Sequence, residues 1–423
     1  GDQVATIAAL RAHGLADDSG VKVFDPVDSV SPVLKSRFGV GSWSPLTRGM
    51  DFDRAMKAAK SLADSLGEPG GGNEAFFRTS AQALVGGLLW LAAQLDEIRY
   101  RQGRHGGGMA TVRTWIDGAV PWVSHDETAA PGNDLVGLLQ SVRSAEWVKP
   151  GDYDKAYQAI ESRLGPAMPA ETRGGIVGTA QNMVWPWLNS SVEASSADAD
   201  ITLGWVLGDD QTDEERRTEP RSLFLASPPS DMRRFAPVFA GCLNDLLEQA
   251  SMRYNERGVP FDPPLLILVD EAGNTPIGEL PEFASTVAAM GILLVCVYQS
   301  VAQITSQYKD KTGTLIANFL TKIMFAGQSD PDTLELFAKL LGEEEVRQTS
   351  VTDSEGHDSA QTSTMLTGLT PLAQLRTMRV GDFLCLHGTL PPIWGRWLPW
   401  FKLRAFATQR RIIEAFNNEI DTE

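Results

Sequence analysis

Two adjacent acidic residues behind an apolar run are the strongest candidates for chemistry in this chain of 423 residues. Residues 264–274 read PLLILVDEAGN, so five apolar residues lead directly into Asp270 and Glu271. A buried strand that ends in this way places the Asp270 carboxylate where it can hold Mg²⁺ directly or through water. Glu271 is then placed to polarise the water that attacks a γ-phosphate. The pattern is that of a Walker B motif and predicts ATP and Mg²⁺ as ligands.

A polar residue at the end of the next apolar run adds to this interpretation. The run ILLVCVYQ brings Gln299 to a strand end, 29 residues after Asp270. In RecA-like motors a polar side chain at this place contacts the γ-phosphate or its water. Taken singly, the acidic pair also fits a solvated strand end, and Gln299 also fits a strand cap. Taken together, they predict a site with Asp270, Glu271 and Gln299 as catalytic residues, Asp270 and Gln299 on the nucleotide, and Asp270 on Mg²⁺.

A phosphate-binding loop is the part of such a site that the sequence lacks. No G-x-x-x-x-G-K-[ST] motif occurs, and the chain has no Gly-Lys dipeptide. The Gly-rich stretches GEPGGG (67–72) and HGGGM (105–109) contain no Lys and are interpreted as linkers. The phosphate cradle is therefore expected upstream of Gly1 or nowhere. A carboxylate pair without that cradle holds a triphosphate poorly, so these residues alone are expected to be inactive.

The elements that must position these residues are short apolar strands separated by helical patterns. The strands expected are Val21–Phe24, Leu223–Ala226, Leu265–Val269, Ile292–Val297, Lys322–Phe325 and Phe383–Leu386. Continuous apolar strands that alternate with helices predict an α/β fold with a mostly parallel sheet covered on both faces. Ligands bind beyond the carboxyl ends of the strands in such folds, which is where Asp270 and Gln299 are expected.

A long helical stretch interrupts this alternation. The helices expected there are Glu74–Tyr100, Met109–Asp117, Asp134–Val142, Asp152–Leu164 and Thr172–Leu188. No strand pattern occurs among them, so we expect an all-α domain (73–190) inserted between two parts of an α/β domain (1–72 and 191–423). Residues 207–221 and 348–364 are polar and are expected to be loops.

The composition limits the class of protein. Hydrophobic residues make up 43% of the chain and charged residues 22%, as in soluble globular proteins. The net charge of −17 argues against a surface that coats duplex DNA, although it permits a locally basic channel. The three cysteines are scattered in apolar surroundings, which predicts buried thiols in a reducing compartment. The longest apolar run, Ala81–Leu95, falls short of a membrane span of about 20 residues.

Basic residues gather at one place. Arg99, Arg101 and Arg104 surround Tyr100 at the end of the first helix of the inserted stretch. Such a cluster can bind phosphates. It equally fits the preference of Arg for helix C-termini, where it meets the negative end of the helix dipole. The sequence leaves both interpretations open.

Residues 265–308 resemble the segment of type IV coupling proteins, of the TraG and TraD kind, that runs from Walker B to a conserved Gln. The resemblance rests on DEAGN, a following Leu-Pro, a Gly before the next strand, and the pair Gln299 and Gln303. Further blocks of the family match in order, with the actinobacterial branch fitting best. They are VFDPVDSV (23–30), SWSPLTRGMDFDRAMKAAKSLADS (42–65), NEAFFRTSAQALVGGLLWLAAQ (73–94) and LTPLAQLRTMRVGDFLCLHGTLPPI (369–393).

The resemblance implies a RecA-like P-loop NTPase core with an inserted all-α domain. It implies an ATPase that delivers single-stranded DNA, free or bound to a relaxase, to a type IV secretion channel in conjugation. It also implies a Walker A loop upstream of Gly1, an N-terminal membrane anchor that leaves this part in the cytoplasm, and a hexameric ring. The expected partners are the relaxosome, through the all-α domain, and the proteins of the channel.

One position departs from the family. Many relatives carry an arginine finger three residues before the Gly that precedes the sensor strand, where this chain has Ala288. Arg347, Arg376 and Arg379 are candidates for that role, and each also fits an ordinary surface Arg. The alternatives for the whole chain are a protein-secretion or DNA-segregation ATPase and a non-hydrolysing adaptor that binds a partner protein. The residues encoded before Gly1 discriminate between motor and adaptor.

Overall fold

A computed structural model describes most of the chain. The described residues are 20–30, 32, 35, 38–66, 71–118, 120–123, 134–197, 199–275, 277–278, 280–354, 357–404, 407, 410–411 and 414. The chain divides into two compact units, one of residues 1–295 with 411–423 and one of residues 296–410. The boundary between these two units lies at residues 295 and 296. It does not test the domain boundaries expected near residues 72 and 190, which remain predictions.

The first unit contains two small sheets. Its strands are β1 (Val21–Phe24), β2 (Gly39–Val40), β3 (Ser222–Leu225), β4 (Leu265–Val269) and β5 (Ile292–Cys296). Strand β1 pairs in parallel with β2 on one side and with β3 on the other. Strand β4 is bonded to β5, and the Leu265 N–H donates to the Gly291 carbonyl (3.1 Å), so both strands start side by side and run in parallel. The predicted parallel strands of this unit are confirmed.

The other regular elements among the described residues of the first unit are helices, and between residues 71 and 197 every described regular element is a helix. The helices are α3 (Phe52–Asp64), α4 (Asn73–Arg101), α5 (Gly108–Ile116), α6 (Leu135–Arg143), α7 (Pro150–Leu164), α8 (Ala170–Val184), η2 (Trp185–Leu188), α9 (Ser190–Ala194), α10 (Leu203–Leu207), α11 (Asp213–Thr218), α12 (Pro229–Arg234), α13 (Ala236–Arg257), η3 (Ala272–Asn274) and α14 (Leu280–Thr286). The five helices expected in this stretch are present within a few residues of their predicted ends.

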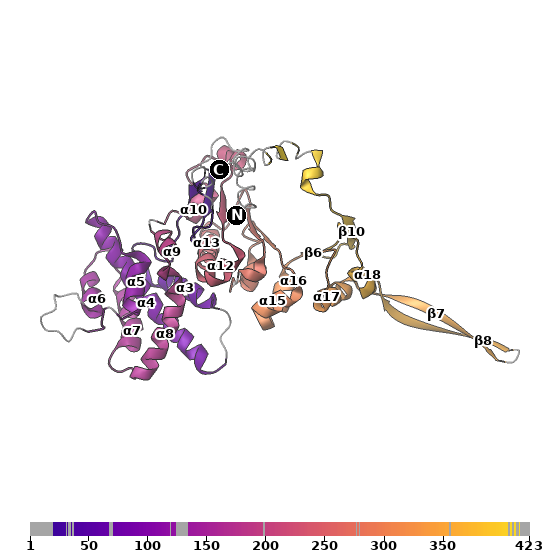
Figure 1. Ribbon diagram of the computed structural model, residues 1–423, viewed down its shortest axis with the longest axis horizontal. Coiled ribbons are helices and arrows are strands. Elements are labelled where there is room, and N and C mark those ends of the chain that lie inside the picture. Colours follow the sequence, from indigo (N-terminus) through magenta and orange to yellow (C-terminus); the bar gives the residue numbers. More distant parts are fainter. Residues whose placement is uncertain are drawn as a thin grey trace. The chain divides into compact units, whose positions relative to one another are not determined.

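Helix α4 lies at the centre of the helical stretch, in contact with α3, α5, α6, α7 and α8 (Figure 1). Nearly every side chain from Ala81 to Asp96 is buried, so α4 is apolar around its circumference instead of along one stripe. Two glycines let its neighbours approach closely. A Cβ at Gly86 would lie 2.4 Å from Met56 Sδ on α3, and one at Gly87 would lie 2.8 Å from Ile160 Cγ1 on α7.

A buried tryptophan links the N-terminal segment of the chain to α13. Trp43 is 2% exposed, and its indole N–H donates to Asp245 Oδ2 (3.2 Å). The ring lies against Gly241 of α13, where a Cβ would come 2.6 Å from Trp43 Cη2. Helix α3 meets the same helix, where Asn244 Nδ2 donates to Ser61 Oγ (2.9 Å). Helix α13 therefore holds together segments nearly 200 residues apart in sequence.

The second unit is built on an antiparallel sheet. Its elements are α15 (Val301–Tyr308), η4 (Lys309–Lys311), α16 (Thr312–Asn318), β6 (Thr321–Phe325), α17 (Pro331–Leu341), β7 (Glu343–Ser354), β8 (His357–Gly368), α18 (Leu372–Arg376), β9 (Asp382–His387), β10 (Ile393–Arg396) and η5 (Trp400–Lys402). Strand β9 pairs antiparallel with both β6 and β10. The expectation that the late strands join a parallel sheet is corrected here, because an apolar run fixes a strand but not its direction.

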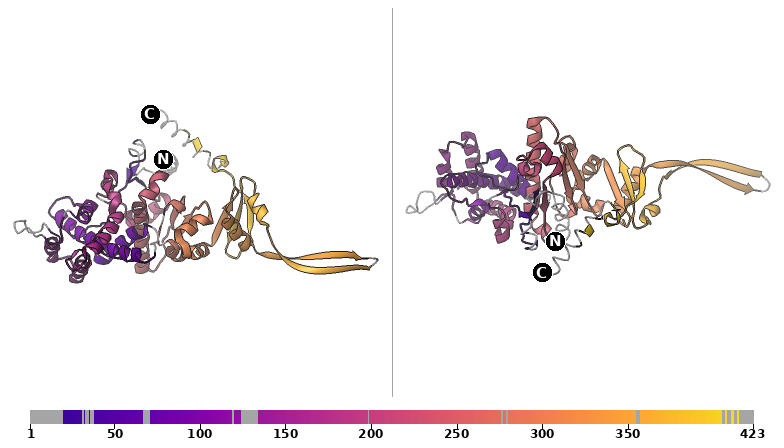
Figure 2. Two further views of the ribbon diagram at one scale, coloured as in Figure 1. Left: turned by 60° about the horizontal axis from the view of Figure 1, so that its bottom comes forward. Right: turned by 90° about the horizontal axis from the view of Figure 1, so that it is seen from above.

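The polar stretch 348–364, expected to be a loop, lies within a long antiparallel hairpin. Strands β7 and β8 pair in register from Glu343 opposite Gly368 to Ser354 opposite His357. Figure 2 shows this hairpin as a two-stranded ribbon that leaves the remainder of its unit. Its many Thr, Ser and Val residues favour an extended backbone, so its lack of apolar residues was a misleading sign of a loop.

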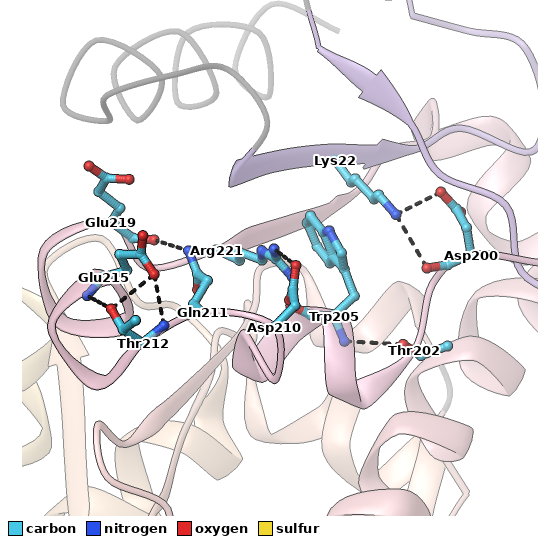
Figure 3. A network of polar contacts seen from close by, with 10 residues as sticks. All are labelled: Lys22, Asp200, Thr202, Trp205, Asp210, Gln211, Thr212, Glu215, Glu219 and Arg221. Atoms are coloured by element: carbon cyan, nitrogen blue, oxygen red, sulfur yellow. Dashed lines mark hydrogen bonds and ion pairs between the residues drawn. The ribbon is translucent and has the colours of Figure 1, made fainter.

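The second polar stretch expected to be a loop, 207–221, is also ordered (Figure 3). Helix α11 starts with a capping box, in which Thr212 and Glu215 exchange hydrogen bonds between side chain and backbone. Arg221 donates hydrogen bonds to both carboxylate oxygens of Asp210 (2.7 and 2.6 Å) and to the Trp205 carbonyl (3.1 Å). Bidentate pairs of this kind fix geometry as well as charge.

The three cysteines are less uniformly buried than the sequence predicts. All three cysteines are free, Cys242 is buried, and Cys296 and Cys385 are half-buried. Burial raises the pKa of the Cys296 thiol to about 12 and that of Cys242 well above its usual value, so neither is a ready nucleophile. No helix in the described ranges is long and apolar enough to cross a membrane.

We predict that Gly241→Ala destabilises the first unit. The added methyl group meets the Trp43 ring, which is buried and held by its hydrogen bond to Asp245, so the free energy of unfolding should fall by about 1–3 kcal/mol. Gly178→Ala on α8 is the matched control, because nothing lies within 4 Å of a Cβ there. The control should be neutral or more stable by up to about 1 kcal/mol. Urea unfolding followed by tryptophan fluorescence measures both, and equal effects would contradict the packing described.

Candidate functional site

The acidic pair lies where the sequence predicts it, directly after strand β4. Val269 ends the strand as a buried residue, and Asp270 and Glu271 follow as exposed residues. The Glu271 N–H donates to Asp270 Oδ1 (3.1 Å), so the Asp270 side chain is held over the backbone of the next residue. Asn274 Nδ2 donates to Glu271 Oε2 (3.1 Å), so the Glu271 carboxylate is also held from the far side of the turn.

The backbone at Glu271 is strained. Its φ of 51° and ψ of 47° lie in the left-handed region, which costs a residue with a Cβ about 1–2 kcal/mol. Glycine is the usual residue there, and the sequence places a Glu instead. Non-glycine residues in this region gather at functional sites, where a side chain must be presented at a cost in stability. The strain at Glu271 is therefore an independent sign that this position serves chemistry.

The carboxylates do not make a metal site by themselves. No cluster of three or more His, Cys, Asp or Glu side chains that could hold a metal occurs in the part of the chain that the structure describes. Mg²⁺ needs about six oxygen ligands and usually takes one or two from protein carboxylates. Asp270 thus fits a Mg²⁺ ion that arrives with nucleotide phosphates and water.

The strand pair that carries the site presents one apolar face outward. Leu266, Leu268 and Leu293 are each about 60% exposed, while Val269 and Ile292 point to the other face and are buried. Side chains alternate along a strand, so this pattern shows that one face of the strand pair is exposed and the other is buried. The prediction of a sheet covered on both faces is therefore not met by β4 and β5 in the described residues.

Gln299 belongs to the second unit, three residues beyond β5. Its backbone is fixed by two amide side chains. The Gln299 N–H donates to Gln303 Oε1 (2.8 Å), and Gln328 Nε2 donates to the Gln299 carbonyl (2.9 Å). The Val301 N–H next to it donates to Thr333 Oγ1 (2.8 Å). The predicted pair of Gln299 and Gln303 is thus a linked unit that leaves the Gln299 side chain exposed.

The family position of the arginine finger and the candidate replacements can be located in the fold. Ala288 is exposed in the turn before β5, where its carbonyl accepts from the Gly291 N–H (3.2 Å). Arg376 ends α18 and Arg379 lies in the turn before β9, both exposed, in the second unit. Arg347 is part of β7.

A third acidic residue at a strand end was not singled out from the sequence. Asp25 follows β1 and is only 6% exposed. Its carboxylate accepts hydrogen bonds from the Ser29 N–H (2.9 Å), the Ser29 hydroxyl (2.8 Å) and the Val30 N–H (2.8 Å), and it pairs with Lys35 (3.0 Å). Burial raises the pKa of Asp25, but these hydrogen bonds outweigh it and the net pKa is lowered. The signal in the sequence was the Asp-Pro that follows an apolar run.

The Gly-rich stretch at 106–108 is not the linker that the sequence suggested. The Gly107 and Gly108 N–H groups donate to the two carboxylate oxygens of Asp96 (2.7 and 2.9 Å). Asp96 is 3% exposed and also pairs with Arg99 (3.2 Å). These backbone donors are therefore occupied by the chain's own carboxylate, as befits a turn that closes α4 onto α5.

Comparisons with known proteins find a matching family model for one segment and several solved structures with a similar fold. Residues 264–379 match a family model described as the TraM recognition site of TraD and TraG. The fold is similar to that of the bacterial conjugative coupling protein TrwBdeltaN70 in its unbound form, with a TM-score of 0.57, 15% identity, and coverage of 90% of this chain and 74% of that one. TrwB with the ATP analogue ADPNP gives a TM-score of 0.56 at 14% identity, covering 90% and 75%. TrwB with ADP and Mg²⁺ gives 0.54 at 14% identity, again covering 90% and 75%. No curated protein matches the sequence.

The similarity in fold confirms the predicted class, a RecA-like α/β core of parallel strands and many helices. The matched family segment begins at Pro264, one residue before β4, and contains Asp270, Glu271 and Gln299. The three residues chosen from their spacing thus lie in the segment that this family model matches.

We predict that Asp25→Asn lowers the stability of the first unit in a pH-dependent way. An amide cannot accept from all three donors and loses the pairing with Lys35, so the variant should lose about 1–3 kcal/mol of unfolding free energy at pH 7. The folded-state pKa of Asp25 is lowered, so its contribution is present above the ordinary pKa of about 3.9. The difference from the wild type should disappear as the pH falls through the lower, folded-state value.

Urea unfolding at a series of pH values from about 7 to about 2 measures this difference. Asp154→Asn is the control, because it removes an exposed carboxylate from the surface of α7. A difference between Asp25→Asn and the wild type that persists below the range in which aspartate titrates would contradict the role given to the Asp25 charge.

Proposed function

We propose that this chain is part of an ATP-driven DNA translocase, a proposal supported by its resemblance to type IV coupling proteins, by the matching family model and by the similar folds. It would deliver single-stranded DNA, free or bound to a relaxase, to a type IV secretion channel. The observation that carries the proposal is the exposed Asp270-Glu271 pair at the carboxyl end of β4, within the segment that matches the TraD and TraG model. A parallel strand end is where α/β folds bind their ligands.

In this proposal each residue of the site has one role. Asp270 holds Mg²⁺ through one carboxylate oxygen or through water, since its other partner is the Glu271 N–H. Glu271 orients and polarises the attacking water, and its strained backbone presents the carboxylate at the strand end. Gln299 contacts the γ-phosphate or its water, and its backbone is held by the hydrogen bond it donates to Gln303 and the one it accepts from Gln328.

The nucleotide and the metal are supported by the similar structures, because TrwB has been seen with ADP and Mg²⁺ and with an ATP analogue. Mg²⁺ neutralises charge on the phosphates when it is bound there. The proposal also requires a Walker A loop, which these 423 residues do not contain. We place it upstream of Gly1, so the chain by itself should hold nucleotide weakly.

The partners of the proposed motor follow from the same resemblance. The family description of residues 264–379 names a recognition site for TraM, which supports a contact with proteins that process the DNA for transfer. A hexameric ring, a membrane anchor outside these residues, and an all-α domain at 73–190 that meets the relaxosome belong to the proposal. Each of them is separate from the chemistry and is tested separately.

We predict that Glu271→Gln abolishes ATP turnover and leaves nucleotide binding intact. The amide is isosteric and can keep the hydrogen bond to Asn274, but it cannot polarise water as a carboxylate does. The loss of turnover should be about 10²-fold or more, with the dissociation constant for ATP changed less than about threefold. The measurement needs a chain extended upstream by the residues its gene encodes before Gly1.

Glu282→Gln is the matched control, because Glu282 is an exposed glutamate in the first turn of α14, outside the proposed site. It should leave turnover unchanged. Unchanged turnover in Glu271→Gln would instead remove the catalytic assignment. If the extended wild type neither binds nor hydrolyses ATP, the adaptor interpretation replaces the motor.

A further inference from the structure

We infer that the end of helix α4 forms a binding surface for single-stranded nucleic acid, made of two guanidinium groups stacked on two aromatic rings. The four residues are Arg48 with Tyr100 and Arg101 with Trp147. This goes beyond the proposed hydrolysis, with which it shares only the expectation that nucleic acid is a partner. The surface lies in the first unit, and none of its residues belongs to the nucleotide site.

The first stacked pair is the more exposed. The Arg48 guanidinium carbon lies 3.7 Å from the centre of the Tyr100 ring, which is stacking distance. Tyr100 is 59% exposed and Arg48 is exposed, so the pair is open to a ligand. One face of the Tyr100 ring contacts the Arg48 guanidinium, and much of the remaining ring surface is exposed to water. This is unusual for a purely structural role, because large aromatic rings normally bury most of their surface.

The second pair lies beside the first on the neighbouring side of the helix, since consecutive residues of a helix are about 100° apart. The Arg101 guanidinium carbon lies 4.0 Å from the centre of the Trp147 ring. Arg101 is also bonded to Glu97 (2.7 Å), which holds the guanidinium in one orientation while leaving it about half exposed.

A buried amide fixes the parts of this surface relative to one another. Gln94 is 2% exposed, its Nε2 donates to the Met50 carbonyl (2.8 Å), and its Oε1 accepts from the Trp147 indole N–H (3.0 Å). The Gly49 N–H donates to the Ala93 carbonyl (3.1 Å), so the loop that carries Arg48 is tied to α4 twice. The surface is thereby preorganised, which lowers the entropy lost on binding.

The charges around the surface favour a polyanion. Among the described residues no ion pair involves Arg48 or Arg104, and Arg104 is exposed in the turn after α4. Arg99 is different, because it turns away to pair with buried Asp96 (3.2 Å). The surface thus offers Arg48, Arg104 and the partly neutralised Arg101 in a chain whose net charge is −17. A local cluster of cations stands out against that background.

Stacked planar groups favour single-stranded nucleic acid over other polyanions. Unpaired bases stack on aromatic rings and on guanidinium planes, while the same arginines contact the phosphates. Duplex DNA hides its base faces, and an acidic peptide needs the charges but not the rings. A surface that combines Tyr100, Trp147 and arginines therefore matches a ligand that has phosphates and exposed bases together.

The test is fluorescence anisotropy with the whole 423-residue chain, a labelled 20-nucleotide thymidine oligomer and no added ATP. The chain should bind the oligomer, and the logarithm of affinity should fall with the logarithm of salt concentration with a slope of about −2, as three cation–phosphate contacts imply. Arg48→Ala and Tyr100→Ala should each weaken binding by about fivefold or more. Tyr100→Phe keeps the ring and should bind like the wild type.

Arg257→Ala is the matched control, because it removes an exposed arginine from another helix end, that of α13. It should change affinity by less than about twofold, as expected for one distant charge. Circular dichroism checks that the exposed substitutions leave the fold intact. An abasic oligomer of the same length and a polyglutamate peptide are used as competitors, and both should compete much more weakly than unlabelled thymidine oligomer.

Three results would overturn the inference. The wild type does not bind the oligomer, or Arg48→Ala and Tyr100→Ala behave like Arg257→Ala, or the abasic oligomer or polyglutamate competes as well as the thymidine oligomer. Competition by polyglutamate would assign the surface to an acidic partner protein, and competition by the abasic oligomer would show that the bases are not recognised. Because no ATP is present, failure here is independent of failure of the proposed hydrolysis.

Discussion

Burial of helix α4 on all sides is the constraint on which the first unit depends. A helix without a polar face cannot lie on a surface, so α3, α5, α6, α7 and α8 pack around it. Helix α3 then extends this packing to α13 through Asn244 and Ser61, and Trp43 joins the same helix. The exposed end of α4 inherits this rigidity through Gln94, which lies in the core yet fixes a surface loop. The same helix therefore provides the centre of the core and fixes the positions of residues at the surface.

A second constraint decides where chemistry is possible. The backbone of a parallel strand ends in a turn whose residues are exposed, so polar side chains gather at that edge. Asp25 and Asp270 show the two uses of such a position. Asp25 is buried and satisfied by Ser29, Val30 and Lys35, so it stabilises a loop. Asp270 is exposed and followed by the strained Glu271, so its oxygens stay accessible. The difference between a structural and a candidate catalytic carboxylate is thus the number of donors already around it.

The sequence predicted best those features that depend on local patterns. The strands β1 and β4 were placed to the residue, and the site residues Asp270 and Glu271 follow from the second of them. Patterns that depend on partners were less accessible. The direction of β9 depends on its neighbours, the hairpin of β7 and β8 has no apolar alternation, and Arg221 orders residues 207–221 through Asp210. Gly107 and Gly108 looked like a linker because the carboxylate they bind, that of Asp96, is eleven and twelve residues earlier in the chain. The contact between Arg48 and Tyr100 joins residues 52 positions apart and leaves no mark in either local sequence.

The most direct test of the central claim, that the strand ends belong to a DNA-dependent ATPase, is the rate of ATP hydrolysis with and without single-stranded DNA. The present chain is compared with one extended upstream by the residues that its gene encodes before Gly1. The account predicts that the extended chain hydrolyses ATP and that single-stranded DNA increases the rate of hydrolysis. It predicts no ATP hydrolysis by the present chain. An extended chain that is inactive both with and without DNA, although it is folded, would contradict the account.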